Sequence, residues 1–180
     1  MDEQTPSPPE APVDSAEADW LPPLILMEEH DHDWKRYVEA VYAVFRADFV
    51  LSQPRFAGLW VRHRREPIYD GREAGFWHCI QEGEVEDARL PDLRRCERIR
   101  WIRAVIEHAD DERVDVWENE RGGERNTLIW FDEEYLIVLR HRTRQRDGFR
   151  YLMLWTAYGT TEERRRAQLR KERDGWVGGA

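Results

Sequence analysis

The sequence YLIVLRHR at residues 135–142 is followed, after one short break, by FRYLMLWTAY at residues 149–158. Both segments have strand length, and both are rich in the branched and aromatic residues that favour strands. The first ends in the basic triplet RHR, and the second ends in the hydroxyl-bearing triplet TAY. Two such strands bring cations, an imidazole and hydroxyl groups to one edge of a sheet, where these groups can hold and attack a phosphodiester.

Two more strand-length segments precede this pair, at residues 113–119 and 126–131. The breaks between the four segments fall at residues 121–123, 132–134 and 145–148, and each break is short enough for a hairpin. The spacing therefore predicts a four-stranded antiparallel meander.

Helical patterns precede the meander. Asp33 is placed to cap a helix that runs to about Asp48, with apolar residues at three- and four-residue steps. Pro91 is placed to open a second helix, but the pattern leaves its end open between Ile99 and Glu107.

The remaining patterns complete the predicted fold. Residues 56–64 have the pattern of one more strand, and residues 76–80 form a short apolar element. Thr160 and Thr161 are placed to start a basic helix that ends before Gly175. We predict an α+β fold, in which N-terminal helices pack on a four- to five-stranded antiparallel meander sheet with a short C-terminal basic helix.

Length and composition predict one domain. The chain has 180 residues, and its nine tryptophans, six tyrosines and six phenylalanines supply enough buried area for a core. Residues 1–19 are rich in proline and acidic residues and are predicted to be a disordered tail. We expect a single α+β domain over residues 20–174 and a flexible C-terminus over residues 175–180.

The net charge of −9 is unevenly distributed. Residues 1–33 contain ten acidic residues and no lysine or arginine, whereas residues 139–173 contain eleven basic and four acidic residues. Because a local basic field decides phosphate binding, the global acidity does not exclude nucleic acid, although it disfavours tight nonspecific binding of duplex DNA. One hypothesis is that residues 1–33 fold over the basic C-terminal surface and mute its activity.

The cysteines and the apolar segments predict a cytoplasmic protein. Cys79 and Cys96 provide no disulfide framework and suit a reducing compartment. No segment approaches the roughly 18 apolar residues of a membrane span, and the first residues lack the pattern of a signal peptide. The two cysteines also lack metal-ligand spacing, so we expect no metal. We also expect no cofactor and, because no apolar span is present, no membrane partner.

His78 is the first candidate for proton transfer. An imidazole titrates near neutral pH, so it can take a proton from a ribose hydroxyl or give one to a leaving oxygen. His78 lies inside the otherwise apolar run FWHCI. The equally simple alternative is a core histidine that is hydrogen-bonded to a backbone carbonyl.

Four arginines are candidates for phosphate binding. Arg98 and Arg100 follow the basic start of the second helix, and Arg140 and Arg142 share one face of a strand by period-two alternation. Guanidinium groups bind phosphate oxygens in a bidentate manner and stabilise charge that builds in a transition state. For any one arginine, a solvated ion pair is the simpler interpretation.

Thr156 and Tyr158 lie two residues apart and are expected to share one face of the last strand with Leu152 and Leu154. A hydroxyl and an aromatic ring can bind phosphate and stack a base. Both residue types are also common in strands without any function.

Two further groups belong to the same set of strands. His141 is expected to point away from Arg140 and Arg142, which makes it a weaker candidate for RNA binding at the same site. Glu118 is a possible carboxylate base, or simply a surface residue of its strand.

With these residues placed, the chain resembles the barnase–EndoU–colicin–RelE superfamily of small ribonucleases, in its phage- and mobile-element-associated branch. The resemblance covers roughly residues 56–173. It is carried by His78 in the Phe-Trp-His element, by the arginine-rich helix, and by the terminal Thr156-Ala157-Tyr158 of the last strand.

The resemblance implies metal-independent RNA cleavage, in which the ribose 2′-hydroxyl attacks its own phosphate. His78 would then be the general base or acid, Arg140 and Arg98 would hold the phosphate, and Thr156 and Tyr158 would position phosphate and base. Many members of this superfamily are toxins of toxin–antitoxin, phage or interbacterial systems. The implied partners are an RNA substrate and an antitoxin or another inhibitory protein.

Two other functions fit the same residues. The chain could be a noncatalytic phage or mobile-element accessory protein that binds a partner protein through the same sheet face. It could also bind RNA without cleaving it, and this binding would weaken with salt.

Overall fold

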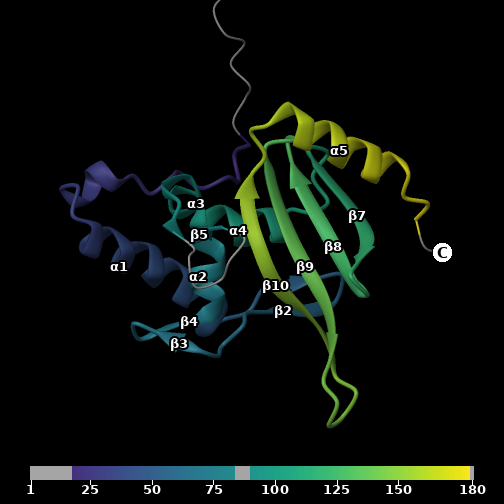
Figure 1. Cartoon of the computed structure of the whole chain (residues 1–180), viewed down its shortest axis with the longest axis horizontal. Helices are drawn as coiled ribbons and strands as arrows, with labels where there is room; N and C mark the ends of the chain where they lie inside the picture. Colours follow the sequence, from purple (N-terminus) through teal and green to yellow (C-terminus); the bar gives the residue numbers. More distant parts are fainter. Residues whose placement is uncertain (1–17, 84–89, 179–180) are drawn as a thin grey trace, which may run out of the picture.

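The computed structural model describes residues 18–83 and 90–178, and within these ranges the chain is an α+β protein (Figure 1). The predicted α+β class is confirmed. The predicted disordered tail, residues 1–19, lies outside the described residues except for its last two positions.

The central sheet has six strands in the order β1-β2-β10-β9-β8-β7. Strands β7 to β10 pair with their sequence neighbours in antiparallel fashion, whereas β2 pairs with β10 in parallel. The sheet is therefore mixed and has six strands, whereas an antiparallel meander sheet of four to five strands was predicted. The bounds are β1 Arg55–Phe56, β2 Leu59–Arg62, β7 Val114–Arg121, β8 Glu124–Phe131, β9 Tyr135–Thr143 and β10 Arg150–Gly159.

The extra strands come from residues 56–64, which do not form the single strand predicted for them. Ala57 and Gly58 have positive φ angles of 46° and 79°, so the chain turns back and forms the β1–β2 hairpin. The left-handed conformation at Gly58 is open to glycine without steric cost. Helices separate β2 from β10 in the sequence, and a connection of this kind permits the parallel pairing of Val61 with Leu152.

Helices cover both faces of the sheet (Figure 1). Helices α1 to α4 pack on one face, and α5 crosses the other face. The helices are α1 Trp34–Phe45, α2 Ala74–Ile80, α3 Leu93–Glu97, α4 Ile99–Glu107 and α5 Glu163–Asp174, with a 3₁₀ turn at Met27–His30 and a π turn at Arg46–Val50. Two small hairpins pair β3 Ile68–Tyr69 with β4 Arg72–Glu73, and β5 Gln81–Glu82 with β6 Leu90–Pro91.

Helix starts follow local hydrogen bonding, in part as predicted. The Asp33 side chain accepts a hydrogen bond from the backbone N–H of Arg36 at 3.0 Å and caps α1, which confirms the predicted helix start. Pro91 does not open α3, because it belongs to β6 and Asp92 is the N-cap. The region between Ile99 and Glu107, where the pattern left the helix end open, is a separate helix, α4.

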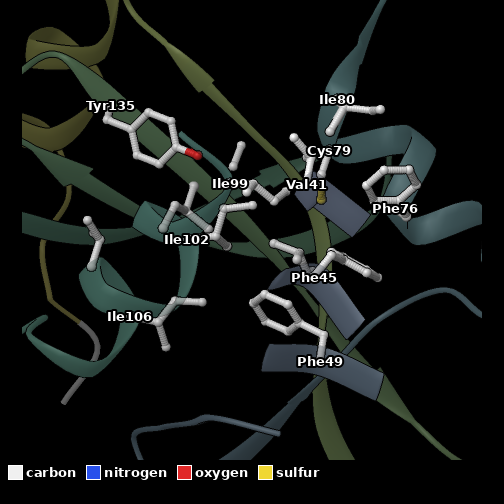
Figure 2. Packing of buried hydrophobic residues seen from close by; sticks show 14 of the residues in the cluster. Val41, Phe45, Phe49, Phe76, Cys79, Ile80, Ile99, Ile102, Ile106 and Tyr135 are labelled. Carbon is white, nitrogen blue, oxygen red and sulfur yellow. The ribbon is translucent and has the colours of Figure 1, made fainter. Parts of the chain in front are cut away.

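The main core lies between helices α1 to α4 and the sheet (Figure 2). Its centre is aromatic, with Phe45 in contact with both Phe49 and Phe76 at ring-centroid distances of 5.3 and 5.6 Å. Cys79 and Cys96 lie in this core as free thiols, and burial raises the pKa of each thiol to about 12. Neither thiol is therefore a nucleophile near neutral pH.

The acidic segment before α1 is anchored on α3 and α4. The Trp20 ring stacks on His108 at 4.5 Å, and its indole N–H donates to Asp111 at 2.8 Å. The backbone N–H of Ile25 donates to the Glu97 carbonyl at 3.0 Å. The hypothesis that residues 1–33 cover the basic C-terminal surface is thus wrong for residues 18–33, because Trp20 and Ile25 hold this segment against α3 and the end of α4. Residues 1–17 lie outside the described residues.

A second, smaller core holds α5 against the sheet. Leu169 of α5 packs with buried Trp117 and Trp130. Thr160 does not cap α5 as predicted, because its hydroxyl accepts from the Trp130 indole at 3.0 Å and donates to the Glu133 carbonyl at 2.6 Å.

Glu172 provides the polar attachment of α5. Its carboxylate accepts hydrogen bonds from the Trp117 indole at 2.9 Å, the Asn119 amide at 2.7 Å and the Arg121 guanidinium. Burial alone would raise the pKa of Glu172, but the hydrogen bonds outweigh burial, and the pKa lies below its usual value.

Glu172→Ala is expected to lower the free energy of unfolding by about 2 kcal/mol at pH 7, because the buried Trp117 indole and the half-buried Asn119 amide lose a charged acceptor. A carboxylate with a depressed pKa in the folded state stabilises the fold above its unfolded pKa, and this stabilisation is lost as the pH falls through the folded pKa. The difference from the parent should therefore shrink below about pH 4 in urea unfolding. Glu120→Ala is the control, because Glu120 is an exposed residue of β7, the strand that carries the donors to Glu172. An equal loss in both variants would contradict this role of Glu172.

Candidate active site

The second half of β10 is an open strand edge. Pairing with β2 is limited to Leu152 and Met153, so the following residues of β10 face α2 and α3 instead of another strand. Trp155 is the extra residue of a β-bulge, because Leu154 pairs with Leu139 and Thr156 pairs with the next residue of β9. Bulges of this kind interrupt regular pairing and redirect side chains.

The bulge corrects one prediction. Leu152, Leu154 and Ala157 all contribute to the main core, so the inward side of the strand changes register at the bulge. Tyr158 packs against the second core, under α5. Thr156 and Tyr158 therefore do not share a face with Leu152 and Leu154, because one inserted residue reverses the alternation of side chains.

His78 lies at the open edge, in the last turn of α2. Phe76, Cys79 and Ile80 of the same helix are buried in the core, which leaves His78 half-buried beside the sheet. Its ring centroid lies 5.5 Å from that of Trp155. The ring is thus not enclosed in the core, as the alternative interpretation required.

Arg64 determines which nitrogen of His78 is the acceptor. The Nη1 atom of Arg64 lies 3.2 Å from Nε2 of His78. A guanidinium group can only donate, so Nε2 accepts this hydrogen bond. In the neutral ring the proton consequently resides on Nδ1.

Three of the four predicted catalytic residues line one pocket. His78, Thr156 and Tyr158 surround a cavity of about 180 Å³ together with Arg95 and Trp155. The structure thus brings together groups that lie almost 80 residues apart in the sequence.

Arg95 of α3 supplies a guanidinium group to the lining of this pocket. Its Nη1 donates to the Thr156 hydroxyl at 3.3 Å, and its Cζ lies 5.2 Å from the centroid of the Tyr158 ring. Its Nε lies 3.7 Å from Oδ2 of Asp92. The sequence pattern did not single out Arg95, because only the docking of α3 on β10 distinguishes it from the neighbouring arginines.

Arg140, the fourth predicted catalytic residue, reaches the site through Trp155. Its Cζ lies 3.3 Å from the centroid of the Trp155 ring, so the guanidinium stacks on the indole. Arg140 does not line the pocket. Burial lowers the pKa of Arg140, although the group stays charged at neutral pH.

A larger cavity of about 770 Å³ adjoins the pocket and shares Glu82, Arg95 and Tyr158 with it. Arg98, a predicted RNA-binding residue, lines this cavity, and Arg165 donates to the Tyr158 hydroxyl at 2.9 Å. We call the two cavities together the edge cleft. The larger cavity is lined by five arginines and four carboxylates, namely Arg94, Arg95, Arg98, Arg165, Arg166, Glu82, Asp92, Glu134 and Glu162.

The other predicted RNA-binding residues lie outside the edge cleft. Arg100 interacts electrostatically with Asp48, beyond α1. Arg142 forms an ion pair with Glu124. His141 lies opposite to Arg140 on β9, as expected from strand alternation.

His141 belongs to a separate acid–base group on the sheet. Its Nε2 lies 2.8 Å from the Thr127 hydroxyl and 3.3 Å from Oε1 of Glu118. Arg125 donates to the same carboxylate at 2.9 Å. Burial lowers the pKa of His141, followed by repulsion from Arg125. This group is a second place where an imidazole and a carboxylate could exchange a proton.

Residues 18–83 and 90–178 contain no group of three or more histidine, cysteine or acidic side chains that is arranged to hold a metal ion. Over the same ranges, none of the helices has the length and apolar character needed to cross a membrane. Comparison with protein-family models, with curated proteins and with solved structures found no match.

Proposed function

We propose that the protein is a metal-independent endoribonuclease that cleaves single-stranded RNA in the edge cleft. The observation that carries this proposal is the convergence of His78, Arg95, Thr156 and Tyr158 on one pocket. A proton-transfer group, a fixed cation, a hydroxyl and an aromatic ring are the groups that this reaction uses.

His78 is proposed to accept the proton of the ribose 2′-hydroxyl. A phosphate oxygen is a stronger acceptor for a guanidinium than an imidazole is, so a bound phosphodiester can draw Arg64 from Nε2 and open that nitrogen. The 2′-oxygen then bonds to phosphorus, the bond from phosphorus to the 5′-oxygen breaks, and the 5′-oxygen takes a proton from solvent. The products are a 2′,3′-cyclic phosphate and a 5′-hydroxyl.

Arg95 is proposed to stabilise the charge that develops on the phosphate. It is held in place by Asp92, Thr156 and the Tyr158 ring, so it loses little freedom when the phosphate binds. The exposed parts of Trp155 and Tyr158 offer ring faces on which unpaired bases can stack.

A role as a toxin-type enzyme extends this proposal. It rests on the resemblance to the barnase–EndoU–colicin–RelE superfamily, including its arrangement of helices against an antiparallel meander with a terminal basic helix. Toxins of this kind act on cytoplasmic RNA and are restrained by an antitoxin or another inhibitory protein. The excess of basic residues over residues 139–173 supplies a surface that an acidic inhibitor or RNA can bind.

Cleavage in EDTA is the direct test of the reaction. The full chain should cut a single-stranded RNA of defined sequence and leave 2′,3′-cyclic phosphate ends. The same RNA with a single 2′-deoxynucleotide should resist cleavage at that position, because the attacking hydroxyl is missing. Cleavage at the deoxynucleotide, or cleavage that requires Mg²⁺, would contradict the proposed chemistry.

A noncatalytic accessory protein is the second candidate. It is favoured by two exposed apolar side chains close to the edge cleft, Leu90 and Leu93, which are 74% and 45% exposed. Exposed apolar residues that cluster beside a charged cleft can mark a protein interface. Salt-sensitive RNA binding without any cleavage would instead indicate a binding module.

A further inference from the structure

A second cavity, of about 310 Å³, lies where β2 meets β10 and shares no lining residue with the edge cleft. We call it the β2–β10 pocket. Its lining combines cations, an imidazole, an amide and an aromatic ring, and includes Gln53, Arg62, His63, Arg65, Tyr151 and Met153.

His63 is the most unusual group in this pocket. It is only 7% exposed, and in the described part of the chain neither of its ring nitrogens forms a hydrogen bond of normal geometry. Its ring meets Phe45 edge to face at 5.6 Å. The Phe49 carbonyl is close enough to affect the ring but does not make a hydrogen bond of normal geometry with it. A buried imidazole whose nitrogens are unsatisfied costs free energy, so its position at a cavity indicates a group that the cavity can receive.

The backbone holds His63 in this position from two sides. The N–H of Gly75 donates to the Arg64 carbonyl at 2.8 Å, and a Cβ at Gly75 would lie 3.1 Å from the Cβ of His63. Only glycine therefore permits α2 to approach so closely. On the other side, the π turn at Arg46–Val50 ends at the pocket, and π turns are frequent at functional sites.

The two arginines of the pocket have no ion-pair partner among the described residues. Arg62 and Arg65 both line the pocket, so their guanidinium groups are available to a ligand there. The Cζ of Arg62 lies 5.5 Å from the centroid of the Tyr151 ring. Two guanidinium groups beside an imidazole match the oxygens of a phosphate, and they would attract a dianion more strongly than a carboxylate.

We propose that the β2–β10 pocket binds a nucleoside monophosphate group, with the phosphate held by Arg62, His63 and Arg65 and the base against Tyr151. The cavity volume far exceeds that of a phosphate alone and lies at the lower end of the range for small-molecule sites. Met153 supplies an apolar wall for a base, and the Gln53 amide can bond to its polar edge. The proposal does not depend on RNA cleavage in the edge cleft.

The charge of His63 should respond to this ligand. Burial lowers the pKa of His63, and the charges of Arg65 and Arg62 lower it further, while Glu73 and the Phe49 carbonyl act in the opposite direction. A bound phosphate dianion adds a negative charge beside the ring and favours the imidazolium form. The pKa of His63 should therefore rise when the pocket is filled.

Calorimetric titration of the full chain with adenosine 5′-monophosphate, adenosine and inorganic phosphate tests the proposal. The monophosphate should bind more tightly than either of the other two. Arg62→Ala should weaken its binding by about 10- to 100-fold, whereas Arg55→Ala, in which the lost guanidinium stacks on Trp60 outside the pocket, should not. The ring-proton NMR signal of His63 should titrate at higher pH with the monophosphate than without it.

His63→Phe removes the imidazole from the same position and should abolish the NMR response and weaken binding, without loss of folding. Two trinucleotides that differ only in carrying a 5′-phosphate or a 5′-hydroxyl test whether the pocket takes its nucleoside monophosphate group from an RNA end or from a free nucleotide. Equal affinity for adenosine and its monophosphate, equal affinity for inorganic phosphate, or unchanged affinity in Arg62→Ala would each overturn the proposal.

Discussion

His78→Ala is expected to slow RNA cleavage by about 10²- to 10⁴-fold, the usual contribution of a positioned general base. The expectation follows from the position of the ring in the edge cleft, where it lines one pocket with Arg95, Thr156 and Tyr158. His78 is half-buried, so its replacement should leave the fold intact. The single-turnover rate on a defined RNA in EDTA measures the effect, and the unfolding midpoint confirms that the variant is folded.

His141→Ala is the matched control for this prediction. His141 is also half-buried and also lies close to the sheet, but its partners are Thr127 and Glu118 on the opposite face from Arg140. If the edge cleft is the active site, His141→Ala should cleave at nearly the parent rate. The reverse pattern, an active His78→Ala and an inactive His141→Ala, would move the active site to the Glu118–His141 group.

Arg95→Gln is expected to slow cleavage by about 10²- to 10³-fold, as is usual when one group that stabilises the transition-state charge is lost. Glutamine retains a donor for the Thr156 hydroxyl but removes the positive charge beside the phosphate. The loss should appear mainly in the rate at saturating RNA, because the charge develops in the transition state.

Arg100→Gln is the control for Arg95→Gln. Arg100 lies only five residues further along the chain, but it interacts with Asp48 and lines neither cavity of the edge cleft. The two variants lose the same charge from neighbouring helices. Similar losses of activity in both would mean that overall charge, and not a specific contact in the cleft, supports the reaction.

The strands were predictable because their alternation is local. Strand β9 runs from Tyr135 to Thr143, one residue beyond the segment that the sequence pattern indicates. Strand β10 likewise extends only one residue beyond its predicted end at Tyr158. The cap at Asp33 was also predictable, because a side-chain cap depends on residues only three positions away.

The sheet order and the bulge were not predictable in the same way. The parallel pairing of Val61 with Leu152 joins residues about 90 positions apart, and no local pattern specifies it. At the bulge, Trp155 stacks with Arg140 of the neighbouring strand, and no local pattern specifies this contact. For the same reason the sequence indicated His78, Thr156 and Tyr158 as candidates, but Arg95 could be selected only after α3 was placed against the strand.

The position of bound RNA tests the central claim most directly. A short RNA that carries 2′-O-methyl groups, which block cleavage, and 4-thiouridine can be cross-linked to the full chain at low salt and digested with trypsin. The edge cleft predicts cross-links at Trp155 or Tyr158, in the tryptic peptide of residues 151–164. Cross-links confined to the peptide of residues 114–121, which contains Glu118, would place the RNA on the other face of the sheet and contradict the account.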